Sequence, residues 1–415
     1  MSIPVWTIAR KWLHIGITAK VGPSVSLGGR DELWSMTVIA FLVFYGNSMI
    51  APLIPALARG FGVRPYALKW LVPGFSILYG TATLFYGFLS DRFGRYPVLR
   101  TLLIVAALTT FILSFAMSAR QLVLLRLLSA AGTGGIATIA LSIVGDHYPY
   151  AVQGRPMGRM FAAIAAGMGL GSSLGSLLNP LIGWRIELRI LALSFGTAAC
   201  WLSWRYKNDV HPRIADHSLW GYALEYRCIV DAPRGGRTLA FILANGAFHG
   251  GIFAWLGVFL ANRYHLSEIG IGLVLAGYGL PDLLFGETIG SSADRYGRRY
   301  VVPMGFFGAS ICALLLAVQS TPWISALIIT VLSAGFVATH PLMASITTSL
   351  DPKRRGQITG LATFVNFVGM GLGALVFRRL MAPDFGLAFV SFGCAEFGVG
   401  VLALYVFRTE TPIAG

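Results

Sequence analysis

Charge is scarce in this 415-residue chain. Charged residues make up only 12% of the sequence, whereas hydrophobic residues make up 56%, and the mean hydropathy is +0.71. A water-soluble domain carries about twice that fraction of charge. The composition therefore excludes an ordinary soluble domain and predicts a chain that is embedded in lipid.

Acidic residues and cysteines are fewer still. The 17 acidic residues face 32 lysines and arginines, which gives a net charge of +15. These basic residues are scattered over short intervals between apolar runs, so the charge predicts no nucleic-acid partner. The cysteines are widely spaced and predict neither a disulfide framework nor a metal site. They are Cys200, Cys228, Cys312 and Cys394.

Motifs of enzymes are missing as well. The sequence has no nucleophile constellation, no metal-ligand cluster and no G-x-x-x-x-G-K nucleotide loop. It therefore predicts neither an enzyme nor a cofactor, and it argues against an ATP-driven pump.

Long apolar runs, by contrast, recur along the whole chain. A membrane-spanning helix needs roughly 20 mostly apolar residues. We therefore predict an all-α membrane protein with twelve spans near 34–57, 67–88, 99–118, 121–145, 158–182, 188–204, 237–261, 269–290, 300–319, 323–349, 357–377 and 385–407.

The polar intervals predict the domain organisation. We expect a cytoplasmic tail at 1–33, a six-helix bundle at 34–204, a cytoplasmic linker at 205–236, a second six-helix bundle at 237–407 and a tail at 408–415. The first tail is either an interfacial helix or disordered. With both termini inside, roughly 22 of the 32 basic residues lie on the cytoplasmic side, as expected for a monomer in the inner (plasma) membrane.

The chain contains an internal repeat. The stretch 87–95 reads G-F-L-S-D-R-F-G-R, and 203 residues later 290–298 reads G-S-S-A-D-R-Y-G-R. The sequence G-M-G-L-G at 167–171 recurs at 369–373. Repeats of this kind predict two bundles related by a pseudo-twofold axis, with a substrate site between them.

The repeated motif resembles the signature loop of the major facilitator superfamily, and within that family the chain looks most like the drug/proton antiporters of multidrug efflux. The resemblance implies that the loop latches the cytoplasmic side and is released during transport. The residues implied are Gly87, Asp91, Arg92, Gly94 and Arg95 in the first copy, Asp146 after the fourth span, and Gly290, Asp294, Arg295, Gly297 and Arg298 in the second copy.

Physical reasons support this role for the motif. Gly87 and Gly94 are expected to let the chain turn tightly and helices approach closely, Asp91 can accept hydrogen bonds at a neighbouring helix end, and Arg92 and Arg95 can hold carboxylates. Asp146 is either the partner of Arg95 or a solvated charge at a helix end. A basic loop placed by topology alone would explain the arginines, but not the duplicated glycines and aspartates.

Two further segments are compared with the family. Arg126 is similar to the family's buried arginine followed by glycines, which makes it either a functional group in the membrane or a side chain that snorkels to the surface. The fifth span departs from the antiporter signature G-x-x-x-G-P-x-x-G-G, because 171–180 reads G-S-S-L-G-S-L-L-N-P. This segment therefore does not support antiport.

Five titratable residues within predicted spans are candidates for proton coupling. Asp282 is the first choice, since a carboxyl group in an apolar span can take up and release a proton. Glu287 suits a structural contact at the helix end equally well, and Glu396 lies in a span that is peripheral in the resembled fold. His249 and His340 can relay protons or bind an anion, or they can hydrogen-bond between helices.

The candidate substrate cavity has few polar groups among apolar neighbours, which suits an amphipathic organic solute better than a sugar. Asn47 occupies the position at which similar antiporters often carry an acid. The internal repeat places His249 beside the residue of the second half that corresponds to Asn47. Each aromatic residue alone also fits a core or lipid-facing position. The candidates are Tyr45, Asn47, Arg126, His249, Trp255, Tyr278, His340 and Asn366.

Three functions follow from these features. The first is a secondary transporter that exports a small amphipathic solute in exchange for protons. The second is uptake or exchange of an organic anion, with Arg126, His249 and His340 supplying positive charge. The third is a membrane sensor or scaffold that does not transport, against which the duplicated motif argues.

Overall fold

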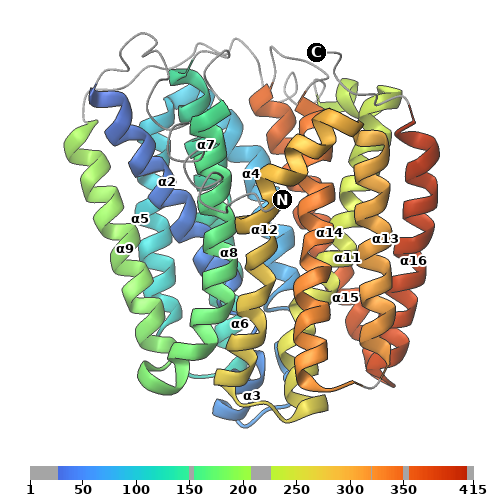
Figure 1. Cartoon of the computed structure of the whole chain (residues 1–415). Coiled ribbons are helices and arrows are strands. Elements are labelled where there is room, and N and C mark those ends of the chain that lie inside the picture. The colour runs from blue at the N-terminus through green and yellow to red at the C-terminus, as the bar shows by residue number, and fades with distance from the viewer. Residues whose placement is uncertain (1–26, 149–153, 207–225, 319, 349–354, 409–415) are drawn as a thin grey trace, which may run out of the picture.

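The computed structural model describes residues 27–148, 154–206, 226–318, 320–348 and 355–408, which are almost entirely helical (Figure 1). Most of the predicted tails at 1–33 and 408–415, and of the linker at 205–236, lies outside these ranges. Helix already begins at Leu27 and at Pro233, earlier than the predicted bundle boundaries. The reason is that helical structure continues past the apolar run into polar residues.

The first half of the chain forms one bundle. Its helices are α2 (Leu27–Ser48), α3 (Ile54–Gly60), the 3-10 helix η1 (Pro65–Leu68), α4 (Pro73–Phe93), α5 (Arg95–Leu113), α6 (Ala119–Thr133), α7 (Ile136–His147), α8 (Gly154–Ile182) and α9 (Trp184–Arg205). The second half forms the other bundle from α11 (Pro233–Tyr264), α12 (Glu268–Tyr296), α13 (Arg298–Ala317), α14 (Pro322–Thr348), α15 (Arg355–Met381) and α16 (Phe385–Val406).

Among the described residues, eleven helical segments are long and apolar enough to cross a membrane. In addition, α2 and α3 form the first span, which is interrupted around Pro52. The predicted all-α membrane fold of two six-helix bundles is confirmed. Figure 1 shows the two halves side by side, with α2 beginning and α16 ending at the same face. We call this the terminal face, and the face that carries α3 the opposite face.

The repeated motif differs in form from the predicted loop. Each copy is mostly helix, because α4 continues to Phe93 and α12 continues to Tyr296. The turn is confined to one glycine in each copy, with φ of 92° at Gly94 and 89° at Gly297. These angles are rarely adopted by residues that have a Cβ, so each glycine lets one span end and the next begin without a longer loop.

The duplicated G-M-G-L-G segments pack in equivalent ways. A Cβ on Gly167 or Gly171 would lie 2.5 or 2.4 Å from backbone oxygens of α2, and one on Gly369 or Gly373 would meet backbone oxygens of α11 in the same way. The middle glycine of the first segment, Gly169, faces the other bundle instead, where a Cβ would lie 2.9 Å from the Cα of Gly279 on α12. The two copies of the repeated segment therefore make equivalent close contacts between helices.

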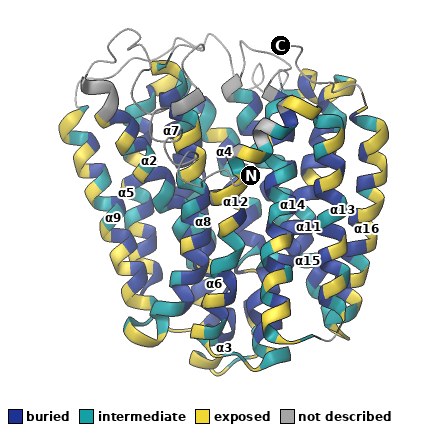
Figure 2. Ribbon diagram, viewed as in Figure 1, coloured by how far each residue is buried: buried dark blue, intermediate teal, exposed yellow. Residues whose placement is uncertain are grey.

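Exposed positions lie along the outer helices of both bundles (Figure 2), and many of the exposed residues are large and apolar. Leu193 on α9 and Met304 on α13 are 69% and 70% exposed, although they belong to apolar helices. An apolar surface of this extent on long helices is suited to lipid. The polar side chains of the interior are therefore the ones that can act on a solute.

Candidate functional site

Arg95 joins three helices at the terminal face. Its Nε donates to Oδ2 of Asp146, on the last turn of α7, at 2.6 Å, and its Nη2 lies 3.6 Å from Oδ1 of Asp91 on α4. The turn at Gly94 places Arg95 beside both acids. Asp146 is thus an ion-pair partner of Arg95 rather than a solvated charge.

Other residues of the first motif have different surroundings. Gly87 lies within α4 with open space where a Cβ would stand, so it makes neither the predicted turn nor a close helix contact. Arg92 is exposed, and its guanidinium lies 5.6 Å from the ring centroid of Phe93.

In the second motif, Arg295 is exposed and its guanidinium lies 5.4 Å from the ring centroid of Tyr296, which parallels the first copy. Arg298 begins α13, as Arg95 begins α5. Gly290 and Asp294 lie on α12, and the surroundings of Gly290 and the side chain of Asp294 are outside the described part of the structure.

Sequence reasoning missed a second polar cluster near the terminal face. Oε1 of Glu32 on α2 accepts a hydrogen bond from the hydroxyl of Tyr96 at 2.7 Å and lies 2.8 Å from Nδ1 of His147. The cluster therefore ties the start of α2 to α5 and α7. Glu32 fell just before the first predicted span, so no pattern singled it out.

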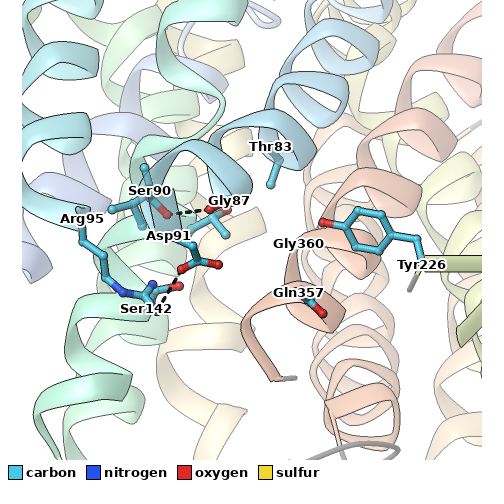
Figure 3. A pocket seen from close by; sticks show the side chains of 11 residues that line it. Thr83, Gly87, Ser90, Asp91, Arg95, Ser142, Tyr226, Gln357 and Gly360 are labelled. Carbon is cyan, nitrogen blue, oxygen red and sulfur yellow. Dashed lines mark hydrogen bonds and ion pairs between the residues drawn. The ribbon is translucent and has the colours of Figure 1, made fainter. Parts of the chain in front are cut away.

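A cleft opens between the bundles near the terminal face (Figure 3). Asp91 and Arg95 line one side of it, and Tyr226, Gln357 and Gly360 line the other. Hydroxyl groups predominate among the remaining lining residues, which are Thr83, Gly87, Ser90, Thr138, Ile139 and Ser142. The ion pair of Arg95 therefore borders a polar entrance between the two halves.

At the opposite face, polar contacts hold the two bundles together. Oε1 of Glu268, at the start of α12, lies 2.7 Å from Nη2 of Arg59 on α3, and its Oε2 accepts a hydrogen bond from Nδ2 of Asn179 on α8. The guanidinium of Arg378 on α15 lies 4.4 Å from the ring centroid of Tyr66 on η1. The contacts of α12 with α3 and α8, and of α15 with η1, thus hold the two bundles together at this face, whereas a cleft lies between the bundles at the terminal face.

Arg126 lies deep in the first bundle. The residue is only 6% exposed, so it does not snorkel to the surface. Its Nη2 donates to the carbonyl oxygens of Gly46 and Asn47, each at 3.1 Å, and its guanidinium lies 3.8 Å from the ring centroid of Phe75. These carbonyls end α2, where the helix dipole favours a cation. Among described residues, Nε of Arg126 has no hydrogen-bond partner.

Other polar groups lie near this end of α2. The side-chain amide of Asn47 is enclosed and lies within reach of the Tyr79 hydroxyl, and Tyr45 is half-buried. On α4, Tyr79 faces the second bundle, with its ring centroid 4.4 Å from that of Phe367 on α15. The first bundle therefore offers a cation and an amide close to its interface with the second.

The second bundle has a matching polar cluster. His249 on α11 is 3% exposed, and neither ring nitrogen has a partner among the described residues. Phe336 lies between the two histidines, edge-on to His249 at 5.0 Å and stacked on His340 at 4.8 Å. One turn from His249, Oδ1 of Asn245 accepts from Thr339 at 2.9 Å. The structure therefore brings His249 and His340 together, as the cavity hypothesis requires.

Asn366 on α15 belongs to the same region. A Cβ on Gly246 of α11 would lie 2.4 Å from its carbonyl oxygen and 3.0 Å from its Oδ1, and that Oδ1 has no donor among the described residues. Helix α15 thus presents a free amide oxygen beside α11.

Five other candidates lie apart from this cluster or have side chains that are not described. Trp255 is 2% exposed and donates its indole N–H to the carbonyl of Ala374 at 2.9 Å, so in this conformation it packs α11 against α15. Tyr278 on α12 contacts Phe253, with ring centroids 5.1 Å apart. Glu396 is enclosed on the outer helix α16. Both Asp282 and Glu287 lie on α12, and their side chains are outside the described residues.

A buried acid, Glu187, was missed by sequence reasoning. It is 4% exposed, and neither carboxylate oxygen has a hydrogen-bond partner among the described residues. The predicted span began at residue 188, one position after Glu187, whereas the helix α9 already begins at Trp184. Only the helix boundary separated this residue from the predicted candidates.

Comparison with known proteins agrees with this arrangement. Residues 36–271 and 238–415 match the family model of the Major Facilitator Superfamily, so the chain belongs to this superfamily of membrane transporters and is not an enzyme. It is 26% identical to the class B tetracycline resistance protein of Escherichia coli, over 82% of this chain and 86% of that protein. It is 27% identical to the class E tetracycline resistance protein of Escherichia coli, over 90% of this chain and 94% of that protein.

Among solved structures, that of a D-xylose-proton symporter resembles this fold, with a TM-score of 0.72. It is 16% identical and covers 92% of this chain and 97% of that one. At this identity the likeness concerns the fold.

Proposed function

We propose that this transporter exports a small amphipathic organic solute in exchange for protons, by alternating access between its two bundles. The observation that carries the proposal is the set of enclosed polar atoms without partners in both bundles, including Nε of Arg126, both ring nitrogens of His249 and Oδ1 of Asn366. Buried polar atoms are normally hydrogen-bonded, so partners missing on both sides of an interface mark a place for a ligand.

The apolar surroundings support an amphipathic solute. Phe75 lies against Arg126 and Phe336 lies against His249, and both rings are apolar groups that offer no hydrogen bond. A solute with an apolar body and a few polar groups fits such a site. Two relatives are named tetracycline resistance proteins, which also favours export of a compound of this kind.

The two faces differ in this conformation, because polar contacts join the bundles at the opposite face and a small polar pocket lies between them at the terminal face. We assign the terminal face to the cytoplasm, because about two thirds of the basic residues then lie inside. On this assignment the small pocket between the bundles faces the cytoplasm, the side from which an exporter takes up its solute.

Vesicles with a pH gradient test this function. Purified protein in liposomes should accumulate tetracycline or chloramphenicol against an opposing proton flux, measured with a pH-sensitive dye trapped inside. Asp282→Asn tests the first predicted coupling residue, with Asp231→Asn on the exposed linker as its control. No flux for any member of a broad compound panel would contradict the proposal and favour a sensor.

Exchange of an organic anion is a second candidate, favoured by the surroundings of Arg126. Its guanidinium is held by carbonyl oxygens and a ring, and no carboxylate is within ion-pair distance among the described residues. A carboxylate or sulfonate on the solute would supply the missing counter-charge. Transport that follows the anion gradient without a pH gradient, and that is lost in Arg126→Gln, would select this alternative.

A further inference from the structure

Glu187 is an enclosed carboxyl group in the first turn of α9, a helix that begins at the opposite face. The residue is 4% exposed, and both oxygens lack a donor among the described residues. An ionised carboxylate in such surroundings is costly unless it is paired. The structure therefore favours a carboxyl group that holds its own proton in this conformation.

The cations of the same helix do not neutralise it. Arg185 donates to the carbonyl of Ala116 at 2.9 Å, and Nε of Arg189 lies 3.3 Å from Oγ of Ser114, both beyond the end of α5. Residues two positions apart do not share a face of a helix. Arg185 and Arg189 are therefore turned away from Glu187.

Three helices pack against α9, and only one brings a titratable group to this level. On α2, Tyr45 lies within electrostatic reach of the carboxyl group. The titratable residues of α5 and α8 all lie at their terminal-face ends, since 101–113 and 160–182 contain none. No cation from these helices can stabilise an ionised Glu187 here.

The position links this carboxyl group to the candidate site. One turn further along α9, Leu191 packs directly on Gly46 of α2. The carbonyl of Gly46 is held by Arg126 from α6. The same turn of α2 therefore lies between the helix that carries the acid and the buried guanidinium.

We propose that Glu187 is a proton-binding site of the transport cycle, an inference that rests on the proposed proton exchange. On release, the O–H bond of the carboxyl group breaks and the proton passes to water, which leaves a carboxylate. On uptake, that carboxylate takes a proton from water. Because the carboxyl group lies within electrostatic reach of Tyr45 on α2, its ionisation acts on the helix whose last carbonyls Arg126 holds, and in this way on the solute site.

The experiment compares Glu187→Gln with wild type in two independent measurements on the full chain in liposomes. Infrared difference spectra across a pH titration detect a protonated carboxyl group directly, without any substrate. Transport of tetracycline and chloramphenicol is measured with a pH gradient and, separately, as exchange without net proton movement. Asp384→Asn is the control, because Asp384 is a carboxylate at the same face that only caps α16.

Glu187→Gln should remove a pH-dependent carboxyl band, lower gradient-driven transport at least tenfold and leave exchange within twofold, whereas Asp384→Asn changes none of these. If the Glu187→Gln variant keeps the carboxyl band unchanged, or keeps full gradient-driven transport, the proposal is overturned. If wild type transports nothing in the panel, the proposed function fails, and the band alone decides whether Glu187 binds a proton. Glu187→Asp, which keeps the acid, serves if the glutamine variant does not fold.

Discussion

Nε of Arg95 and Oδ2 of Asp146 lie 2.6 Å apart, so the first residue of α5 is bonded to the last turn of α7 across the edge of the terminal-face cleft. Asp91 on α4 lies on the other side of the same guanidinium, at 3.6 Å. One arginine thus fixes the ends of three helices that border the entrance. We propose that this arrangement must loosen when the cleft closes and opens during transport.

Removing the acid of this pair tests that role. Asp146→Asn should lower the transport rate about fivefold, since a partly exposed ion pair contributes about 1 kcal/mol. The matched control is Asp231→Asn, whose partner Arg227 is exposed in the linker at the same face. Equal effects of the two substitutions on transport in vesicles would contradict a specific role for Asp146.

Closure of the opposite face depends on Glu268. Glu268→Gln removes the charge that pairs with Arg59 but keeps an oxygen for Asn179, so it should shift the population towards an open face about fivefold. Spin labels at Ala67 and Trp323, exposed residues of the two bundles, would report a longer distance by pulsed electron paramagnetic resonance. A distance distribution identical to that of wild type would exclude this gate; Asp384→Asn is the control.

A side chain at Gly169 should block the close approach of the bundles. Gly169→Val places its Cβ 2.9 Å from the backbone of Gly279, which cannot move away as a flexible side chain would. We expect folded protein with at least tenfold slower transport. Gly196→Val is the control, because nothing lies within 4 Å of a Cβ there. Normal transport by the Gly169 variant would show that the interface opens further than this structure indicates.

Arg126→Lys tests whether the geometry of the guanidinium matters as well as its charge. Lysine keeps the charge but loses the planar group that bonds two carbonyls and stacks on Phe75. We expect a loss of about 1–2 kcal/mol in stability, measured by thermal unfolding, and a transport rate at least tenfold lower. Arg120→Lys, on the exposed first turn of the same helix, should leave both unchanged.

The fold was largely predictable, since the length of apolar runs fixes how often the chain crosses a membrane. The ends of the helices were less predictable, because backbone hydrogen bonding extends a helix beyond its apolar stretch. That difference had a functional consequence at Glu187, which lies in α9 although the apolar run begins one residue later. Trp255 was a candidate for the cavity with a core position as the alternative, and its hydrogen bond to Ala374 places it in the packing between α11 and α15 in this structure.

By itself, the sequence determined the membrane environment, the duplicated bundles and the turn at Gly94, since each follows from composition, spacing or the backbone freedom of one residue. Only the tertiary structure decided which charges meet. Arg59, Asn179 and Glu268 are far apart in the chain and carry no shared pattern, yet they form one contact between the bundles. Pairing and isolation of polar groups depend on how helices face one another, which local sequence does not encode.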